Sequence, residues 1–335
     1  MLLEMGDFRL RSLGALFSPH DSRDIHVAAA IPIKAVTRPF VLPTPPVIAD
    51  QDGVGACVAY SLVKYVKAYQ EYQERAQWLD FSANYLYQRR EPTDFQGSGM
   101  YPRQALANLL KRGVPLESVM PGIKEYGQAT VPANADREAF PQHIAGYVAI
   151  YKPEEVLAAL EQLGPVTIAI DVYDSFYQGG RLSVPDTSKE TNHGGHMMTI
   201  WGVMPPGDDY YIVANSWGPN WGPGVTLPWS GQHIPGFCLM PFSYPIHEMW
   251  SVTDFVPSRP AREIIFRPKG NQEGPWTGSK TAVVDGQTVE MDVEPVIDVA
   301  AGRSLLPARF LAEHLGCEVI SDDKTGTVTI KRVIP

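Results

Sequence analysis

Cys57 is the residue of this chain best placed to act as a nucleophile. It lies in the segment QDGVGACVAYS, after a glycine-containing loop and on the first turn of an expected helix. A helix N-terminus carries partial positive charge and free N–H groups, which stabilise a thiolate and can bind an oxyanion. Gln51, six residues earlier, has an amide donor that the loop could bring to the same point. The alternative is a buried and inert cysteine, which is the commoner fate of a lone Cys.

His196 and Asn215 could complete the chemistry that such a thiol needs. His196 opens the apolar segment HMMTIWGV, and a neutral imidazole beside Cys57 could accept the thiol proton. Asn215 follows the segment YYIVA, and its side-chain oxygen could hold the imidazole in one tautomer, under the cover of Trp217. A structural histidine and a turn asparagine are the simpler interpretations. His193 and His196 also form an H-x-x-H pair, but the glycines between them favour a loop and no further ligand cluster is near, which disfavours a metal site.

These side chains need a scaffold in which a helix faces a set of strands. Apolar residues recur with a helical period after Cys57, and Pro102 and Gly113 bracket another helix in the order that helices prefer. After Pro132 the chain becomes rich in β-branched residues. We therefore expect an α+β fold with a helical lobe, a β lobe and a cleft between them. The expected helices cover 57–77, 82–90, 102–112 and 153–164, and the expected strands cover 144–151, 165–173, 197–203 and 209–217.

Regions of different composition flank this central domain, which we expect to span 41–255. Residues 1–40 are irregular and proline-punctuated, and we interpret them as an arm on the domain surface. A short inhibitory pro-segment is the alternative, although the pattern of a long amphipathic helix is missing. Residues 256–275 are rich in Pro, Gly and charge, which is typical of a linker. Residues 276–335 predict a small α+β domain, with a hairpin at Asp285-Gly286 and a helix from about Pro307 to Leu315.

The composition excludes several classes of protein. Among the 335 residues, 44% are hydrophobic and 19% are charged, which argues against a disordered chain. The net charge of −9 would repel a phosphate backbone, so nucleic-acid binding is not expected. No stretch approaches the roughly 18 apolar residues of a membrane-spanning helix, and the N-terminus does not resemble a signal peptide. Three widely spaced cysteines exclude a disulfide framework and a structural zinc site.

Taken in chain order, the candidate residues resemble the active-site set of the papain-like (C1) cysteine peptidases. The 139 residues between Cys57 and His196 fall within the roughly 130–150 residues typical of that family. QDGVGACVAYS is similar to the family's glutamine-to-cysteine motif, GGHMMTIWGV to its histidine strand and ANSWGPNWG to its asparagine motif. Val54 and Val58 stand where many secreted members have cysteine and tryptophan, so the chain looks more like the short bacterial branch.

The resemblance implies a papain-like two-lobe fold, with Cys57 on a helical lobe and His196 and Asn215 on a β-barrel-like lobe. It also implies a cysteine endopeptidase, which hydrolyses peptide bonds through a thioester acyl-enzyme. Cys57 is then the nucleophile, His196 the general base and later the acid, and Asn215 the residue that orients the imidazole. Gln51 and the Cys57 N–H form the oxyanion hole, and Trp217 shields the bond between Asn215 and His196.

The same resemblance implies a polypeptide substrate and a set of residues that contact it. Four of them would line an apolar pocket for the residue before the scissile one, which predicts a hydrophobic preference there. The four are Tyr101, Pro102, Ala169 and Met197, and the full set adds Gly99, Met100, Gly195 and Trp217.

Residues 277–332 resemble the small domain named after the N-terminal region of copper amine oxidases, through segments such as GRSLLPARF and TVTI. Despite that name, His314 is single and Cys317 alone does not make a copper site, so no metal or cofactor is expected. The resemblance implies an accessory module that attaches the protein to a cell surface or cell wall. The compartment stays open, because an outside location is suggested only by this module.

Two other functions remain open from the sequence. One is a catalytically weak papain-like fold that binds peptide or cell wall. The other keeps the thiol chemistry in an acyl transferase or an amidase.

Overall fold

The computed structural model describes residues 11–33 and 38–254, and beyond them the backbone of seven strands. The chain separates into two compact units, Met1–Val256 and Pro257–Pro335, and each is described by itself.

A continuous helical segment carries Cys57 at its start and forms the centre of the first unit. It consists of α2 (Cys57–Tyr60), the π-helical segment η2 (Ser61–Lys67) and α3 (Ala68–Arg75). The expected helix over 57–77 is therefore confirmed, and its middle part is π-helical. Seven consecutive residues from Cys57 to Val63 are buried, so this helix is enclosed on all sides at its amino end.

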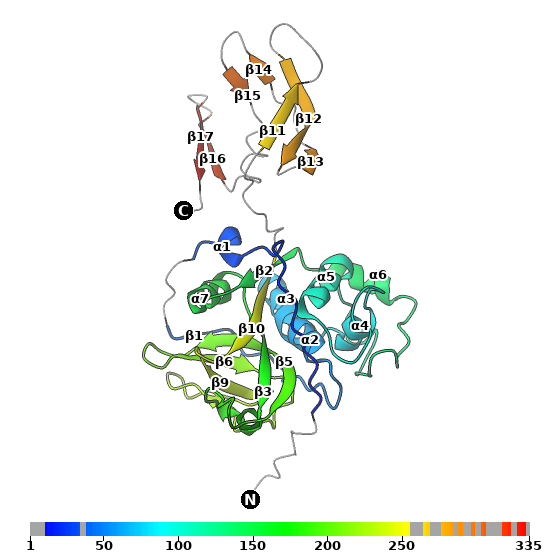
Figure 1. Cartoon of the computed structure of the whole chain (residues 1–335), viewed down its shortest axis with the longest axis vertical. Coiled ribbons are helices and arrows are strands. Elements are labelled where there is room, and N and C mark those ends of the chain that lie inside the picture. The colour runs from blue at the N-terminus through cyan, green and yellow to red at the C-terminus, as the bar shows by residue number, and fades with distance from the viewer. Residues whose placement is uncertain are drawn as a thin grey trace, which may run out of the picture. The chain divides into compact units, whose positions relative to one another are not determined.

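Shorter helices pack on one side of this central segment. Ser82 caps α4, because its hydroxyl oxygen accepts the backbone N–H of Tyr85 at 3.0 Å. Pro102 takes the first position of α5, and Gly113 follows its end. The central helix lies between these helices and a large sheet (Figure 1). The bounds are α4 (Ala83–Gln88), α5 (Pro102–Arg112), α6 (Ala135–Ala139) and η3 (Phe140–Gln142).

The sheet of the first unit has the order β2-β10-β3-β5-β6-β9-β4, with β1 paired to β5. All its pairs are antiparallel except β4 with β9. The expected barrel-like lobe is thus an open sheet that ends at β2 and β4. Its strands are β1 (Phe40–Val41), β2 (Gly146–Ile150), β3 (Val166–Tyr173), β4 (Gly180–Arg181), β5 (Asn192–Val203), β6 (Tyr210–Ala214), β9 (Phe237–Pro241) and β10 (Ile246–Thr253).

The middle strands of this sheet are covered on both faces, which explains their nearly continuous apolar sequence. On β5, the eight residues from His196 to Val203 are all buried. Trp201 of this strand lies edge-on to Tyr65 and Tyr69 of the central helix, with ring centroids 5.9 and 5.6 Å apart. Helix α7 (Pro153–Gln162) packs against β3 and β5. The smaller elements are α1 (Val27–Ala30), η4 (Asp174–Gln178), β7 (Val225–Thr226) and β8 (His233–Ile234).

The second unit consists of short antiparallel strands. Val284 pairs with Gln287, so a two-residue connection joins β12 and β13 where Asp285-Gly286 predicts a hairpin. β11 lies inside the stretch 256–275 that we interpret as a linker, and it pairs with β12. The helix expected from Pro307 to Leu315 falls outside the described residues. The strands are β11 (Ile264–Pro268), β12 (Trp276–Val284), β13 (Gln287–Glu290), β14 (Val296–Asp298), β15 (Arg303–Leu305), β16 (Cys317–Asp322) and β17 (Thr327–Arg332).

Candidate active site

The sulfur of Cys57 is the point at which three distant chain segments meet. Cys57 begins α2 and is fully buried, with 0% of its surface exposed. Burial raises the pKa of the thiol to about 11, while hydrogen bonds from the backbone of Met197, Gly14, Val58 and Cys57 itself lower it. Met197 belongs to β5 and Gly14 to the segment near the N-terminus. Nearby backbone N–H groups therefore favour the thiolate, but burial outweighs them.

The His196 imidazole is held in a single orientation by Asn215. Asn215 follows β6, and its Oδ1 lies 2.7 Å from His196 Nε2. An amide oxygen only accepts, so Nε2 carries the hydrogen of the neutral ring. The backbone of Asn215 is fixed in turn, because its carbonyl accepts the Tyr65 hydroxyl at 2.6 Å. His196 Nδ1 is buried and hydrogen-bonds to no described residue, so it is the ring nitrogen whose lone pair stays unused.

A wall of aromatic rings covers the bond between His196 and Asn215. The Trp217 ring lies 4.8 Å from the imidazole, and Phe176 lies edge-on to Trp217 at 5.5 Å. Tyr177 stacks on Trp217 at 5.7 Å. Since Trp217 is only 1% exposed, water is kept from the His196–Asn215 hydrogen bond, which strengthens it.

The Gln51 side chain is positioned to donate through Nε2, but this nitrogen already donates to other groups. Its Oε1 accepts the Ser216 hydroxyl at 2.6 Å, and its backbone N–H donates to the Ser216 carbonyl at 2.8 Å. This orientation turns Nε2 toward the carbonyl oxygens of Val54, at 2.8 Å, and Ser12, at 3.0 Å. The Ser12 oxygen therefore takes the donor that Gln51 would offer to an oxyanion.

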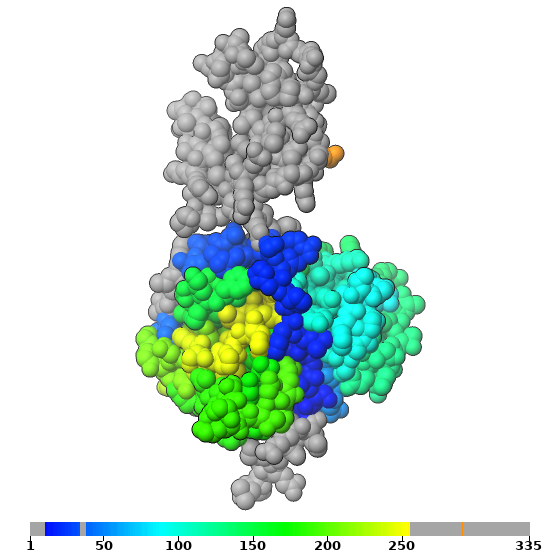
Figure 2. Space-filling model, in the orientation of Figure 1, coloured from blue at the N-terminus to red at the C-terminus, as the bar shows by residue number. Residues whose placement is uncertain are grey.

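The N-terminal arm, defined here as residues 11–33, runs directly over the thiol. Ala15 N–H donates to the Gly195 carbonyl at 3.0 Å, next to His196. The Met100 backbone donates to the Gly14 carbonyl at 2.8 Å and accepts the Leu16 N–H at 2.9 Å, in a parallel bridge. In the space-filling view the arm lies along the boundary between the helical and β lobes (Figure 2). It thus joins both lobes by main-chain hydrogen bonds.

Close approach of the backbone requires glycine at position 14. A β-carbon on Gly14 would lie 1.9 Å from the Gly55 carbonyl oxygen, which is far inside van der Waals contact. On either side of this point side chains anchor the arm, and Arg11 forms an ion pair with Asp50 at 2.7 Å. Three further contacts are the Phe17 ring stacked on His247 at 3.7 Å, the Ser18 N–H on Glu248 Oε1 at 2.8 Å, and Arg103 Nε on Asp24 Oδ1 at 2.9 Å.

With the arm in place, the thiol and the imidazole are both held neutral. Burial lowers the pKa of His196 to about 4, although the Asn215 hydrogen bond raises it. The pKa of the Cys57 thiol stands at about 11, as described above. At pH 7 the neutral thiol and the neutral imidazole are therefore the favoured forms, because both charged forms would be deprived of water.

Three of the residues expected to contact substrate lie against the arm. Gly99, Met100 and Gly195 contact it directly, since β-carbons added to Gly99 and Gly195 would meet Gly14 and Ala15. Met197 and Trp217 lie at the thiol and the imidazole, as described above. The remaining three are Tyr101 and Pro102 at the start of α5, and Ala169 on β3 opposite Met197.

A carboxylate lies beside the expected apolar pocket. Glu248 on β10 is the cross-strand partner of Ala169, so the two side chains lie on one face of the sheet. Glu248 Oε2 accepts the Trp250 ring N–H at 2.7 Å. Burial raises the pKa of Glu248, against these hydrogen bonds, which favours its neutral form.

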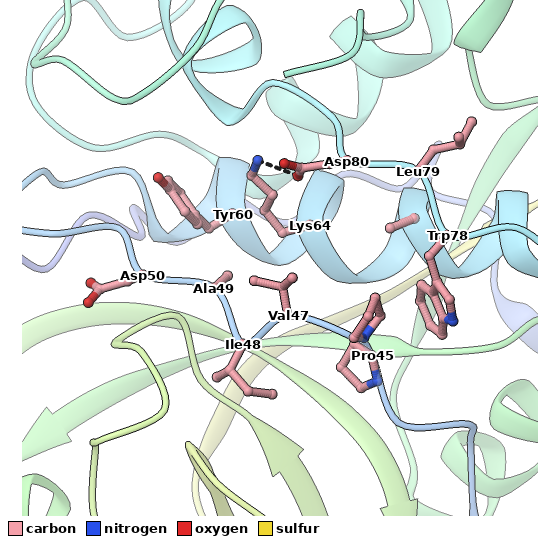
Figure 3. A pocket seen from close by; sticks show the side chains of 12 residues that line it. Pro45, Val47, Ile48, Ala49, Asp50, Tyr60, Lys64, Trp78, Leu79 and Asp80 are labelled. Carbon is pink, nitrogen blue, oxygen red and sulfur yellow. Dashed lines mark hydrogen bonds and ion pairs between the residues drawn. The ribbon is translucent and has the colours of Figure 1, made fainter. Parts of the chain in front are cut away.

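Two cavities lie apart from the thiol. A cavity of about 480 Å³ is bounded by the irregular segment 45–50, by Tyr60 and Lys64 of the central helix, and by Trp78 (Figure 3). Lys64 at its rim pairs with Asp80 at 2.6 Å. A smaller cavity of about 180 Å³ is lined by the arm residues Ser18, His20 and Asp24, with Arg103 and part of β10. None of the residues predicted to act in catalysis lines either cavity.

The described part of the chain shows neither a cluster of metal ligands nor a membrane-spanning helix. Among these residues, no group of three or more His, Cys, Asp and Glu side chains could hold a metal ion. No helix described in the structure is both long and apolar enough to cross a membrane. His314 lies outside the described residues.

Sequence analysis missed the residues that act on the site from a distance. Ser216 orients the Gln51 amide, and Phe176 and Tyr177 extend the aromatic wall. The path of Gly14 over the sulfur was also unexpected. Ser216 had a signal, since it stands between Asn215 and Trp217 in the asparagine motif, and Phe176 ends a weaker match to the family that begins at Gly164.

The geometry agrees with comparisons to known proteins. A model of the papain family cysteine proteases matches residues 45–227, and a model of the copper amine oxidase N-terminal domain matches residues 263–332. A cysteine protease of Blomia tropicalis is 27% identical over 191 residues, which is 53% of this chain and 55% of that protein. Cathepsin R of Mus musculus is 35% identical over 86 residues, or 24% of this chain and 26% of the cathepsin. The chain therefore spans about half, or less, of these relatives.

Two solved structures share the fold of the first unit. Xylellain, a cysteine protease from Xylella fastidiosa, has a TM-score of 0.58 at 21% identity and is matched over 96% of its length and 72% of this chain. ProCathepsin B S9 from Trypanosoma congolense has a TM-score of 0.59 at 19% identity, over 87% of its length and 73% of this chain. A helix that starts at a buried cysteine, a strand that carries a histidine held by asparagine, and a family model that matches more than half of the sequence lead to one conclusion: the chain belongs to the papain family of cysteine proteases.

Proposed function

We propose that this protein is a cysteine endopeptidase in which Cys57 is the nucleophile and His196 the base. The observation that carries the proposal is the His196–Asn215 hydrogen bond of 2.7 Å, which leaves Nδ1 as the free ring nitrogen. The backbone of the next residue, Met197, lowers the pKa of the Cys57 thiol and accepts the Ser61 hydroxyl one turn after Cys57, which supports a strand of the base that reaches the nucleophile. An inert cysteine has no use for an oriented imidazole on the adjoining strand.

The proposed reaction forms and breaks one carbon–sulfur bond. His196 Nδ1 accepts the thiol proton, and the sulfur attacks the carbonyl carbon of the peptide bond. The oxyanion is stabilised by Gln51 Nε2 and the Cys57 N–H. The imidazolium gives its proton to the leaving amine, which leaves a thioester on Cys57. Water, deprotonated by the same Nδ1, then hydrolyses the thioester and restores the thiol.

We also propose that the arm is an intramolecular inhibitor. The support is that Gly14 lies on the sulfur, Ser12 takes the Gln51 donor, and Met100 and Gly195 are paired to arm backbone. A peptide substrate needs the same donors and acceptors. The arm also excludes the water that a thiolate–imidazolium pair requires. Its departure would therefore let substrate reach Cys57 and let the thiol and imidazole ionise.

The test of the peptidase compares two buried cysteines. Peptide hydrolysis by the full chain should be lost on Cys57→Ala, whereas Cys238→Ala should retain it, because Cys238 lies on β9 away from His196. Each variant is assayed alone and in combination with Gly14→Val, a substitution that forces the arm away from the Gly55 carbonyl. Equal turnover in Cys57→Ala and its parent would refute the assignment.

The same assay decides between the alternative functions. A papain-like binding protein would retain peptide in the Gly14→Val chain without cleaving it. An acyl transferase would pass the acyl group from Cys57 to an added amine, which would then appear in the product. An amidase would hydrolyse a non-peptide amide and leave the peptide intact. Mass spectrometry of the products separates these outcomes from hydrolysis.

For the second unit we propose attachment to a cell surface or cell wall. The support is the match of residues 263–332 to the copper amine oxidase N-terminal domain family. Sedimentation of the full chain with purified cell walls tests this. Recovery of all protein in the supernatant would contradict it, whatever the result of the peptidase assay.

A further inference from the structure

We propose that Ser61 is a positioning residue that holds the strand carrying His196 against the helix carrying Cys57, through the main chain of Met197. This inference rests on the proposed peptidase function. Ser61 contacts no substrate in the proposed reaction, and it acts through the distance and orientation of the other two residues.

The first step is the place of Ser61 on the central helix. Ser61 lies four residues after Cys57, so both side chains emerge on the same face, one turn apart. Ser61 is 1% exposed. Its Oγ donates to the Met197 carbonyl at 2.9 Å, across 136 residues of sequence. A buried hydroxyl thus joins the nucleophile's helix to the strand of the base.

The second step is that Met197 makes contact with both residues of this helix face. Its backbone lies close enough to the Cys57 sulfur to lower the pKa of the thiol, and its carbonyl accepts the Ser61 hydroxyl. In an antiparallel strand the N–H and C=O of one residue point to the same side. Pairing of β5 with β6 begins only at Thr199, so this stretch of β5 turns its polar groups to the helix instead. Helix and strand therefore meet at two points, the sulfur and the serine, and the Ser61 hydroxyl forms the hydrogen bond between them.

The third step is that only one of these points survives the reaction. In the acyl-enzyme the sulfur bears an acyl group and no charge, so it becomes a poor acceptor for the Met197 N–H. The Ser61 hydrogen bond involves neither the sulfur nor the imidazole and persists unchanged. It would then keep His196 Nδ1 over the thioester while water attacks. Ser61 also begins the π-helical segment η2, and such segments are frequent at functional sites.

The experiment uses the full chain with Gly14→Val as the parent, so that the arm does not mask the effect. The variants are Ser61→Ala, Ser61→Thr and, as matched control, Ser251→Ala. Ser251 is equally buried and donates to the Pro165 carbonyl at 3.4 Å, but it lies on β10, away from Cys57. Active sites are titrated with a thiol-directed inhibitor, so that kcat refers to folded enzyme only.

We expect Ser61→Ala to lower kcat by about tenfold or more, because small displacements of reacting groups are costly, with KM within about twofold. The acidic limb of the kcat/KM profile should move to higher pH, since a looser imidazole stabilises the thiolate less. Ser61→Thr keeps the hydroxyl and should restore most of kcat and the acidic limb. Ser251→Ala should lower the melting temperature while it leaves kcat and the pH profile unchanged.

The proposal is overturned if Ser61→Ala has an unchanged kcat per titrated site and an unchanged acidic limb. A loss of melting temperature similar to that of Ser251→Ala would then show a structural role only. If Ser61→Thr fails to fold, the comparison of Ser61→Ala with Ser251→Ala still separates a positioning role from a structural one. Absence of Cys57-dependent hydrolysis in the Gly14→Val parent would instead refute the peptidase function itself, so the two failures can be distinguished.

Discussion

Cys57 and Cys238 are both fully buried, yet their surroundings differ in what covers them. Burial raises the thiol pKa of both. Cys238 lies inside β9, between β6 and β4, and nothing short of unfolding exposes it. Cys57 is covered by the arm, a segment held to both lobes largely by main-chain hydrogen bonds. Burial alone therefore does not separate an inert cysteine from a nucleophile, and our proposal makes the arm over Cys57 the difference between the two.

The largest effect is expected from removing the cover. Gly14→Val places a branched side chain where a single β-carbon would already lie 1.9 Å from the Gly55 carbonyl oxygen. We expect the rate of Cys57 alkylation at pH 7.5 to rise by about 100-fold, since one pKa unit changes the thiolate fraction about tenfold. Peptide mapping after iodoacetamide should find Cys238 unmodified in both proteins. Equal labelling of the two cysteines would break the comparison.

Asn215→Ala tests the orientation of the base rather than its exposure. The His196 Nε2 hydrogen bond of 2.7 Å is lost, and the ring is free to change tautomer. We expect kcat to fall about 10- to 100-fold in the Gly14→Val background, because general base catalysis contributes about 10²–10⁴-fold in all. Asn215→Asp keeps an oxygen that accepts the Nε2 hydrogen, so it should lower kcat less than Asn215→Ala does. An alanine variant with the parent's kcat would show that the ring is oriented by its aromatic neighbours alone.

The pH dependence of alkylation sharpens the same contrast. Burial under the arm raises the pKa of the Cys57 thiol to about 11, so the thiol proton is held more tightly and less thiolate exists at a given pH. In the unmodified chain we expect the alkylation rate to rise about tenfold per pH unit between pH 7 and 9.5. In Gly14→Val the curve should level off within that range. Parallel curves in the two proteins would mean that the arm does not control ionisation.

The smallest effect is expected at the outer end of the arm. Arg11 is partly exposed and pairs with Asp50 at 2.7 Å. Such pairs contribute about 0.2–1 kcal/mol, so Arg11→Ala should raise Cys57 alkylation by no more than about fivefold. Arg137→Ala, which removes an exposed pair with Glu138 elsewhere on the surface, is the control. A change as large as that of Gly14→Val would indicate that charge, not main-chain pairing, holds the arm.

Local sequence was sufficient where a side chain's chemistry and its neighbours in the chain specify its role. Ser82 caps α4, and Pro102 begins α5, because capping depends on residues within one turn. Cys57, His196 and Asn215 stand in motifs whose residue types indicate the chemistry. The periodicity also predicted the central helix, although not its π-helical middle.

Only the tertiary structure decided what lies on Cys57 and what holds His196 near it. Gly14, Ala15 and Leu16 pair through N–H and C=O groups, which every residue but proline has, so their partners leave no mark in the sequence. The Ser61 hydroxyl could have bonded to many carbonyls, and the fold selects Met197 by bringing a strand 136 residues away onto its helix. Side-chain types set the chemistry that this chain can perform, whereas long-range main-chain pairing places the arm, in which every residue but proline offers the same N–H and C=O groups.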